Sequence, residues 1–287
     1  MAGVGMRDIK RKIKSVNSTK QITKAMKLVS TAKLKRTRDR LEKVQPYFET
    51  VNDTVQDILK SAGNIDHRYI SEREIKKSLY IVITADRGLC GGYNINAIKK
   101  ALEDVEDKEK ACFIVIGQKA NGYYGKRGYE IVGDYLGISE KPEYRHAKDI
   151  GRLALELYQD EKIDEIKLIY TRFASTISQV PEMIKLLPVA KQEEKKSEEE
   201  EFKYVSYEPS PGVVLDYLIP KYIESTIFGA LVESAASEQA ARRIAMENAT
   251  DNAEEMIANL TLSFNQARQA AITQEISEIV GGAEALK

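Results

Sequence analysis

Apolar residues fall at helical spacing along both ends of the chain. Toward the N-terminus they follow steps of three and four residues through Leu41, Val44, Phe48, Val51, Val55 and Ile58. Toward the C-terminus similar steps run through Met246, Ala249, Ala253, Met256, Leu260, Phe264, Ala267 and Ala271. Such heptad-like stripes are typical of helices that pack along one another.

Glycine and proline rarely interrupt these two ends. Few of them lie between Gly5 and Gly63, and few follow Pro220. The sequence therefore predicts one long helix within residues 1–60 and another from about 211 to 280, the latter roughly 100 Å long at 1.5 Å per residue.

The two ends also carry opposite charge. Residues 7–43 hold 14 basic and 3 acidic side chains, whereas residues 221–287 hold 5 basic and 10 acidic ones. Matching stripes and opposite charge predict an antiparallel coiled coil. The C-terminal stripe is rich in alanine and methionine, which bury little area per heptad. We therefore expect part of that helix to continue past its partner and to depend on another protein for burial.

Strand patterns alternate with helical ones in the middle of the chain. The expected strands are 78–84, 111–117, 129–133 and 165–173, with helices at 94–107 and 144–160. A further run at 177–189 predicts an edge strand, because Pro181 argues against a central position. This alternation is typical of a Rossmann-like α/β domain.

The fold class predicted is thus α/β, with a long antiparallel coiled coil of the N- and C-terminal helices plus a Rossmann-like α/β domain. We place the coiled-coil helices at 1–60 and 209–287 and the α/β domain at 75–190. Between them, 191–208 is a linker that contains the charged run "KQEEKKSEEEE".

The N-terminal helix is strongly basic. Between Ile9 and Arg38 it carries eleven lysines or arginines and no acidic residue. Apolar residues recur in it at Ile22, Ala25 or Met26, Val29 and Ala32, and we expect this stripe to pack against the other helix. Because so many cations repel one another, a counter-charge is expected. Stacking aromatics for a single nucleic-acid strand and large apolar anchors for a bilayer are missing, so an acidic protein surface is the favoured partner.

The numbers of charged residues and cysteines, and the lengths of the apolar runs, narrow the class of protein further. Lys+Arg and Asp+Glu both number 44, which disfavours a general nucleic-acid binder, although a nucleic-acid-binding coiled coil stays as the second hypothesis. No apolar run reaches the roughly 18 residues of a membrane span, and the N-terminus lacks the apolar core of a secretion signal. Two cysteines without CxxC spacing indicate a reducing compartment.

One loop invites comparison with phosphate-binding loops. "TADRGLCGGYN" (84–94) follows a predicted strand and opens a predicted helix, yet it matches neither GxGxxG nor a P-loop. We interpret it as a structural or contact loop, with a nucleotide site through Gly88–Gly92 as the third hypothesis. His67 and His146 are isolated in polar surroundings and are expected at the surface. No catalytic, metal or cofactor site is predicted.

Four long motifs carry a resemblance to a known family. The run "RQAAITQEISEIVGGAEAL" (268–286) resembles the C-terminal signature of the γ subunit of F-type ATP synthases. Residues 9–33 are similar to that family's N-terminal helix, "DRGLCGGYN" (86–94) to its central motif, and 237–257 to a further helical segment. The resemblance covers the chain in order.

The resemblance implies a function without chemistry of its own. It implies the central shaft of the synthase, a non-catalytic subunit of a proton-transporting two-sector ATPase, present once per complex. Its implied partners are the α and β subunits, the ε subunit and the c-ring, with no nucleic acid and no cofactor. The absence of an obvious transit peptide leads us to expect a peripheral protein at the cytoplasmic face of a bacterial plasma membrane.

The resemblance also assigns roles to single residues. Met26, with Lys24 and Lys27 around it, matches the part of the family that faces an acidic lever segment of β, while Arg268 and Gln269 match residues that bond a catch loop on β. The residues implied in coupling are Arg242, Thr273 and Glu275. Tyr207 and Glu208 match a region that sits on the c-ring.

Overall fold

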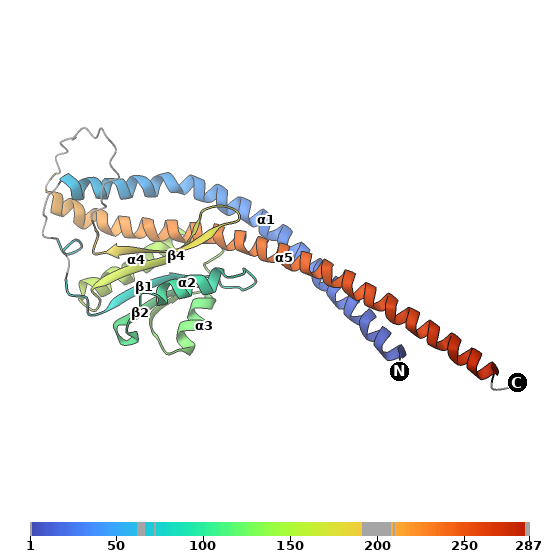
Figure 1. Cartoon of the computed structure of the whole chain (residues 1–287). Helices are drawn as coiled ribbons and strands as arrows, with labels where there is room; N and C mark the ends of the chain where they lie inside the picture. Colours follow the sequence, from blue (N-terminus) through green and yellow to red (C-terminus); the bar gives the residue numbers. More distant parts are fainter. Residues whose placement is uncertain (1, 62–66, 72, 191–207, 209, 285–287) are drawn as a thin grey trace. The chain divides into compact units, whose positions relative to one another are not determined.

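The computed structural model describes residues 2–61, 67–71, 73–190, 208 and 210–284 (Figure 1). It contains five α-helices and five strands in these ranges. The helices are α1 Ala2–Ser61, α2 Tyr93–Leu102, α3 Gln118–Lys126, α4 Tyr144–Gln159 and α5 Pro211–Glu284. The strands are β1 Ser78–Ile83, β2 Ala111–Ile116, β3 Glu130–Tyr135, β4 Glu165–Phe173 and β5 Gln179–Leu187.

The strands form a single sheet in the order β3-β2-β1-β4-β5. The first four are parallel, and β5 pairs with β4 in the antiparallel direction. Pro181 lies in β5 opposite Thr171, at the end of the sheet order, as its missing N–H predicts. The predicted strands and the edge position of the last one are confirmed.

Both faces of the sheet are covered, because residues of β1 alternate between two cores. Leu79, Ile81 and Ile83 join a core with α4 and with parts of α1 and α5. Tyr80 and Val82 face the opposite way, into a core with α2 and α3. This three-layer arrangement explains why the central strands are apolar throughout.

The chain divides into two compact units, and both combine α1 with α5. One unit comprises residues 32–241 and the other residues 1–31 and 242–287. In the first unit the predicted stripe from Leu41 to Ile58 is buried or half-buried in the core against α5. The predicted helix bounds near 60 and 211 agree with α1 and α5, whereas the division into units falls inside both helices.

A glycine marks the close approach of α1 and α5 in this unit. A Cβ at Gly229 would lie 2.8 Å from Cδ2 of Phe48. The Phe48 ring also meets the Phe228 ring edge-on at 6.1 Å. The single glycine inside this stretch of α5 is therefore a packing requirement.

Two helical predictions differ from the structure. The helix expected at 94–107 ends at Leu102, because the chain then turns and the Asp104 carboxylate accepts a hydrogen bond from the Tyr80 hydroxyl. Helix α3 was not predicted, since two glycines and an asparagine give "QKANGYYGK" a weak helical signal. Its first turn is held instead by side chains from other segments.

We expect Gly229→Ala to destabilise the chain by about 1–3 kcal/mol, because the added methyl group overpacks the contact with Phe48. Gly122→Ala, in the exposed middle of α3 with open space around it, should instead stabilise by about 0.5–1 kcal/mol. Thermal unfolding followed by circular dichroism checks both. Equal effects of the two substitutions would contradict the close approach.

Candidate functional site: the paired terminal helices

Most of the site residues implied by the resemblance lie in the unit formed by 1–31 and 242–287. In this part of α1 most of the less exposed residues follow steps of four and three, and the seam they define is Ile9, Ile13, Val16, Lys20, Thr23, Lys27 and Ser30. The seam begins apolar and becomes polar at Lys20. Such spacing keeps one face of a helix toward its partner.

Three cross-helix contacts, which we call the polar ladder, join the polar part of the seam to α5. Lys20 Nζ lies 2.9 Å from Glu254 Oε1, and Lys27 Nζ lies 2.7 Å from Glu247 Oε1. Between them the Thr250 hydroxyl donates to Thr23 Oγ1 at 2.8 Å, and both threonines are buried. Residue numbers rise along α1 as they fall along α5, so the pair is antiparallel.

The stripe expected to form this seam faces the wrong way. Ile22 is 60% exposed and Val29 is 56% exposed, while their neighbours Thr23 and Ser30 are buried. The prediction failed because it followed apolar character, whereas the ladder makes polar side chains the buried ones. Together with exposed Ala25, we call Ile22 and Val29 the outer stripe.

The implied β-contacting residues lie near the outer stripe but in different states. Met26 is half-buried, and Lys24 is exposed without an ion pair in the described part of the chain. Lys27 is engaged by Glu247 of the same chain. Part of the counter-charge for the basic helix thus comes from α5 itself.

Other cations of the basic run have no such partner among the described residues. Of the eleven, five form ion pairs within the chain: Arg11, Lys20, Lys27, Lys33 and Arg38. The remaining six form no ion pair with any described residue. They are Lys10, Lys12, Lys14, Lys24, Lys35 and Arg36. A substantial positive charge therefore faces outward.

The implied residues of α5 differ in exposure, because burial decreases toward the C-terminal end of the helix. Arg242 is only 7% exposed, and Ala271 is the last buried residue. All residues from 272 to 283 are exposed, among them Ile272, Ile276, Ile279 and Val280. This stretch extends beyond what α1 covers, as the sequence predicted. Arg268, Gln269, Thr273 and Glu275 are all exposed.

The implied c-ring contact is only partly described. Glu208 is an exposed residue in a bend, whereas Tyr207 and the linker run 191–201 lie outside the described residues.

The glycine-containing loop after β1 is occupied by the chain's own groups. The Asp86 carboxylate accepts backbone N–H groups of Gln118 and Gly137, at 3.2 and 2.8 Å, and the hydroxyl of Ser139 at 2.8 Å. Thr84 Oγ1 accepts the N–H of Ala120 at 3.0 Å. Within the loop itself, the N–H of Ala85 donates to Asn94 Oδ1 at 2.8 Å and the N–H of Asp86 donates to Ser139 Oγ at 3.2 Å. A phosphate bound in this loop would need free backbone N–H groups of this kind.

Close packing at the end of β2 also leaves little room for a nucleotide near this loop. Gly117 has φ +88°, and a Cβ there would lie 2.3 Å from the carbonyl oxygen of Thr84. Only glycine fits where a nucleotide-binding fold would place its ribose-binding acid. The reading of 84–94 as a structural loop agrees with this geometry.

Helix α5 fills the position beside β1 and β4 where the strand order reverses. Ser234 accepts the N–H of Thr171 through Oγ and the Tyr93 hydroxyl through its carbonyl oxygen, both at 3.2 Å. Glu233 accepts the N–H of Phe173 at 2.9 Å, and burial raises the pKa of this carboxyl. Ligands of doubly wound sheets bind at such reversals.

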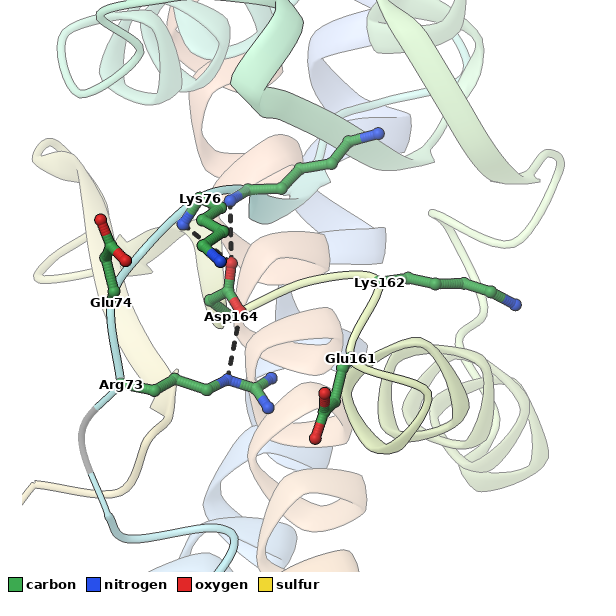
Figure 2. A pocket seen from close by; sticks show the side chains of 7 residues that line it. Arg73, Glu74, Lys76, Glu161, Lys162 and Asp164 are labelled. Atoms are coloured by element: carbon green, nitrogen blue, oxygen red, sulfur yellow. Dashed lines mark hydrogen bonds and ion pairs between the residues drawn. The ribbon is translucent and has the colours of Figure 1, made fainter.

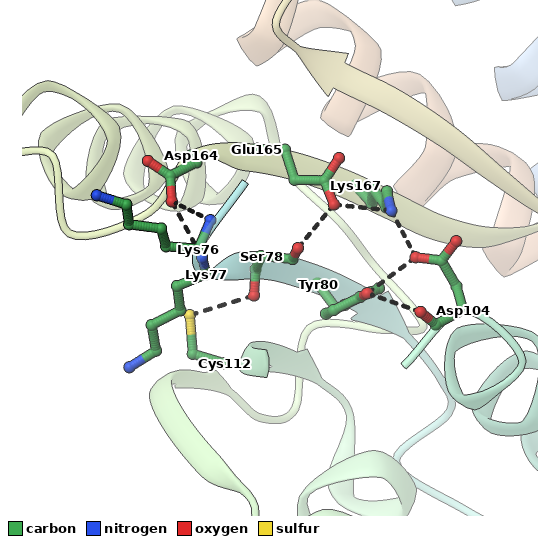
Figure 3. A network of polar contacts seen from close by, with 9 residues as sticks. All are labelled: Lys76, Lys77, Ser78, Tyr80, Asp104, Cys112, Asp164, Glu165 and Lys167. Carbon is green, nitrogen blue, oxygen red and sulfur yellow. Dashed lines mark hydrogen bonds and ion pairs between the residues drawn. The ribbon is translucent and has the colours of Figure 1, made fainter. Parts of the chain in front are cut away.

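Figure 3 shows a charged network on the α2 side of the sheet. Lys167 bridges Asp104 and Glu165, and Glu165 accepts the Ser78 hydroxyl at 2.6 Å. Burial opposes the charge of Lys167, but these hydrogen bonds outweigh it and raise its pKa. Burial, assisted by Asp104, raises the pKa of Tyr80. The network fastens the chain after α2 to β4.

A charged hollow of about 290 Å³ lies where β1 and β4 begin (Figure 2). Its lining consists of Arg73, Glu74, Lys76, Lys77, Glu161, Lys162 and Asp164. Asp164 pairs with Arg73 at 3.2 Å and accepts the N–H groups of Lys76 and Lys77. The Asp164 carboxylate thus holds the segment before β1 against the start of β4.

The histidines differ from expectation in one case. His67 is buried, with Nε2 3.3 Å from Asp216 Oδ1, so the surface prediction was wrong for it. His146 accepts the backbone N–H of Glu143 and caps α4. Within the described ranges, His, Cys, Asp and Glu nowhere gather in a group of three that could hold a metal ion. Over the same ranges no helix has the length and apolar character to cross a membrane.

Solved structures share this class of fold, an α/β domain with long paired terminal helices. A chain of the Euglena gracilis mitochondrial ATP synthase matches 99% of this chain and 95% of its own length, with TM-score 0.70 and 20% identity. A chain of the central stalk and c-ring of the Tetrahymena thermophila mitochondrial enzyme matches with TM-score 0.59 and 24% identity, over 79% of this chain and 99% of that one. The predicted fold class is confirmed.

Sequence comparison identifies the family. A family model described as ATP synthase matches residues 5–286. The ATP synthase gamma chain of Alkaliphilus metalliredigens is 58% identical, over 99% of this chain and 100% of that protein. The sodium ion specific gamma chain of Acetobacterium woodii is 47% identical, over 98% of both. The chain belongs to the ATP synthase gamma-chain family, and the resemblance stated from its motifs is confirmed.

Acid is expected to weaken the helix pair. Hydrogen bonds from Lys27 and Lys20 lower the pKa of Glu247 and Glu254 below their usual 4.5. Since the folded-state pKa is the lower one, this stabilisation is complete above the unfolded value and is lost as pH falls through the folded value. The measurement is thermal unfolding of the parent chain and of the double variant Lys20→Gln/Lys27→Gln between pH 7 and pH 3. The difference between their melting temperatures should shrink as the pH falls. A difference that stays constant over that range would count against the ion pairs.

Removing the Asp86 carboxylate should destabilise the α/β domain by about 2 kcal/mol, because the buried Ser139 and the backbone N–H groups of Gln118 and Gly137 lose a charged acceptor. The measurement is chemical denaturation of Asp86→Ala. Asp149→Ala, at an exposed position of α4, is the control and should stay within about 0.5 kcal/mol of the parent chain. An Asp86→Ala chain as stable as that control would show that the loop does not depend on the carboxylate.

Proposed function

We propose that this chain is the central rotor shaft of an F-type ATP synthase. One copy turns inside a hexamer of α and β subunits. The c-ring, driven by ions, turns it during ATP synthesis, and ATP hydrolysis turns it in reverse. The nucleotide sites belong to the β subunits, and the chain has no active site of its own.

The observation that carries this proposal is the exposed face of α1 in the unit of 1–31 and 242–287. Lys24 is an exposed cation next to Met26, and the outer stripe leaves Ile22 and Val29 open to a partner. A face that is both basic and apolar suits a surface that carries carboxylates among apolar groups. Membership in the gamma-chain family supports the proposal that this surface belongs to the β subunit.

Further contacts are proposed along α5 and in the segment just before it. Arg268 and Gln269 are exposed donors suited to hydrogen bonds with a β loop. Thr273 and Glu275, with Arg242, are assigned to coupling rotation to catalysis. Glu208, with Tyr207, is assigned to the c-ring, and the ε subunit is a further partner of the chain. This assembly would hold the chain at the cytoplasmic face of a bacterial plasma membrane, without a membrane contact of its own.

Single-molecule rotation tests the proposal. The chain is mixed with α and β subunits, the complex is isolated, and a bead is attached through Lys99→Cys on α2. Lys99 is exposed, whereas the native Cys90 and Cys112 are 1% exposed, so labelling is selective. We expect one copy of the chain per complex and stepwise unidirectional rotation with ATP. Failure to assemble, together with salt-sensitive retention on DNA, would favour the nucleic-acid hypothesis instead.

Charge reversal at Lys24 tests the basic face. Lys24→Glu should reduce ATP-driven rotation several-fold, because it places like charges at the contact with β. Lys148→Glu, at an exposed position of α4 in the α/β domain, is the matched control and should leave the rate unchanged. If both variants rotate at the parent rate, Lys24 does not face an acidic surface.

A further inference from the structure

The α1 segment near the polar ladder has two competing faces. The outer stripe lies one residue ahead of the seam: Ile22 precedes Thr23, and Val29 precedes Ser30. One residue turns the helix by about 100°. By burial of apolar area alone, Ile22 and Val29 would be the better seam. The structure nevertheless buries Thr23 at 8% exposure and Ser30 at 2%.

The polar ladder accounts for this choice. Its central contact is a buried hydroxyl pair, in which Thr250 donates to Thr23 and also contacts the carbonyl oxygen of Met246. On α1, Lys20 lies three residues before Thr23 and Lys27 four residues after it. On α5, Glu247 lies three residues before Thr250 and Glu254 four residues after it. These spacings keep each set on one face of its helix, so all three contacts form only in one rotational setting. Buried polar groups at a helix seam are known to select a pairing even where they add little stability.

The charges around the ladder reinforce that setting. Glu247 is bonded by Lys27 from α1 and by Arg243 at 3.1 Å from its own helix. A rotated α1 would leave both carboxylates of the ladder without their lysines. The wrong setting is therefore penalised as well as unrewarded.

We propose that the polar ladder is a positioning device that selects the face of α1 packed on α5 and thereby keeps the outer stripe exposed for a partner. The second half of this statement rests on the proposed function, since the partner there is the β subunit. The first half concerns this chain alone. Lys20, Thr23 and Lys27 are thus positioning residues for the contact that Lys24 and Met26 make.

Two adjacent cysteine probes in the full-length chain test the selection. Val29→Cys reports the outer stripe, which is exposed, and Ser30→Cys reports the seam, which is buried. Maleimide labelling should be fast at the first and slow at the second, and the native cysteines are too buried to interfere. The ladder is then reversed with Lys20→Glu/Lys27→Glu, which sets like charges against Glu254 and Glu247.

In the reversed chain we expect the labelling order to change: Ser30→Cys reacts about tenfold faster or more, and Val29→Cys reacts more slowly. Adding Glu247→Lys/Glu254→Lys restores opposite charges and should restore the original order. Unchanged protection of Ser30→Cys in a folded reversed chain would overturn the proposal, because the apolar ends of the seam would then suffice. Fast labelling of both probes would overturn it too, since the helices would separate rather than turn.

A rotation assay of the same variants separates this proposal from the proposed function. If labelling switches and the variant complex also rotates poorly, with recovery in the charge-restored chain, both are supported. If labelling switches but rotation is unaffected, the ladder selects the face and the outer stripe is not the contact with β.

Discussion

The paired helices depend on one constraint. A single face of α1 must pack on α5 in both compact units, although this contact is apolar in one unit and partly polar in the other. The spacing of four and three residues serves both compact units. Along the stretch from Leu41 to Ile58 it presents large apolar groups to a core. Along the polar ladder it presents lysine and threonine. The first arrangement stabilises through buried area, and the second contributes little stability but specifies the pairing.

In the α/β domain, the chain's own groups occupy the edge of the sheet where the parallel strands end. Asp86 takes the amides at the start of α3, Thr84 takes another, and Gly117 lets the segments close together. Ser234 brings α5 onto the strand-order reversal. The domain thus binds its own carboxylate and its own helix in the places where related architectures bind nucleotides.

The sequence predicted what depends on spacing and buried runs. It predicted both terminal helices, the strands and the edge position of the last strand, because apolar periodicity and Pro181 report these directly. It missed α3, whose glycines hide a helix that Asp86 and Thr84 hold from elsewhere in the fold. It also chose Ile22 and Val29 for the seam. The correct choice required knowing that Glu247 and Glu254 lie opposite the lysines. The residue pattern of one helix alone does not reveal this.

The uncovered end of α5 has a consequence for how the cell handles the free chain. A stretch of about a dozen residues is marginal as a lone helix in water, and Gly281 and Gly282 weaken it further. Its apolar side chains, from Ile272 to Val280, stand open to solvent. In a free copy of the chain this end of α5 is therefore held only weakly, and its open apolar side chains make it a favourable place for proteolysis. A partner that covers these residues in the proposed complex would protect the chain from degradation as it assembles.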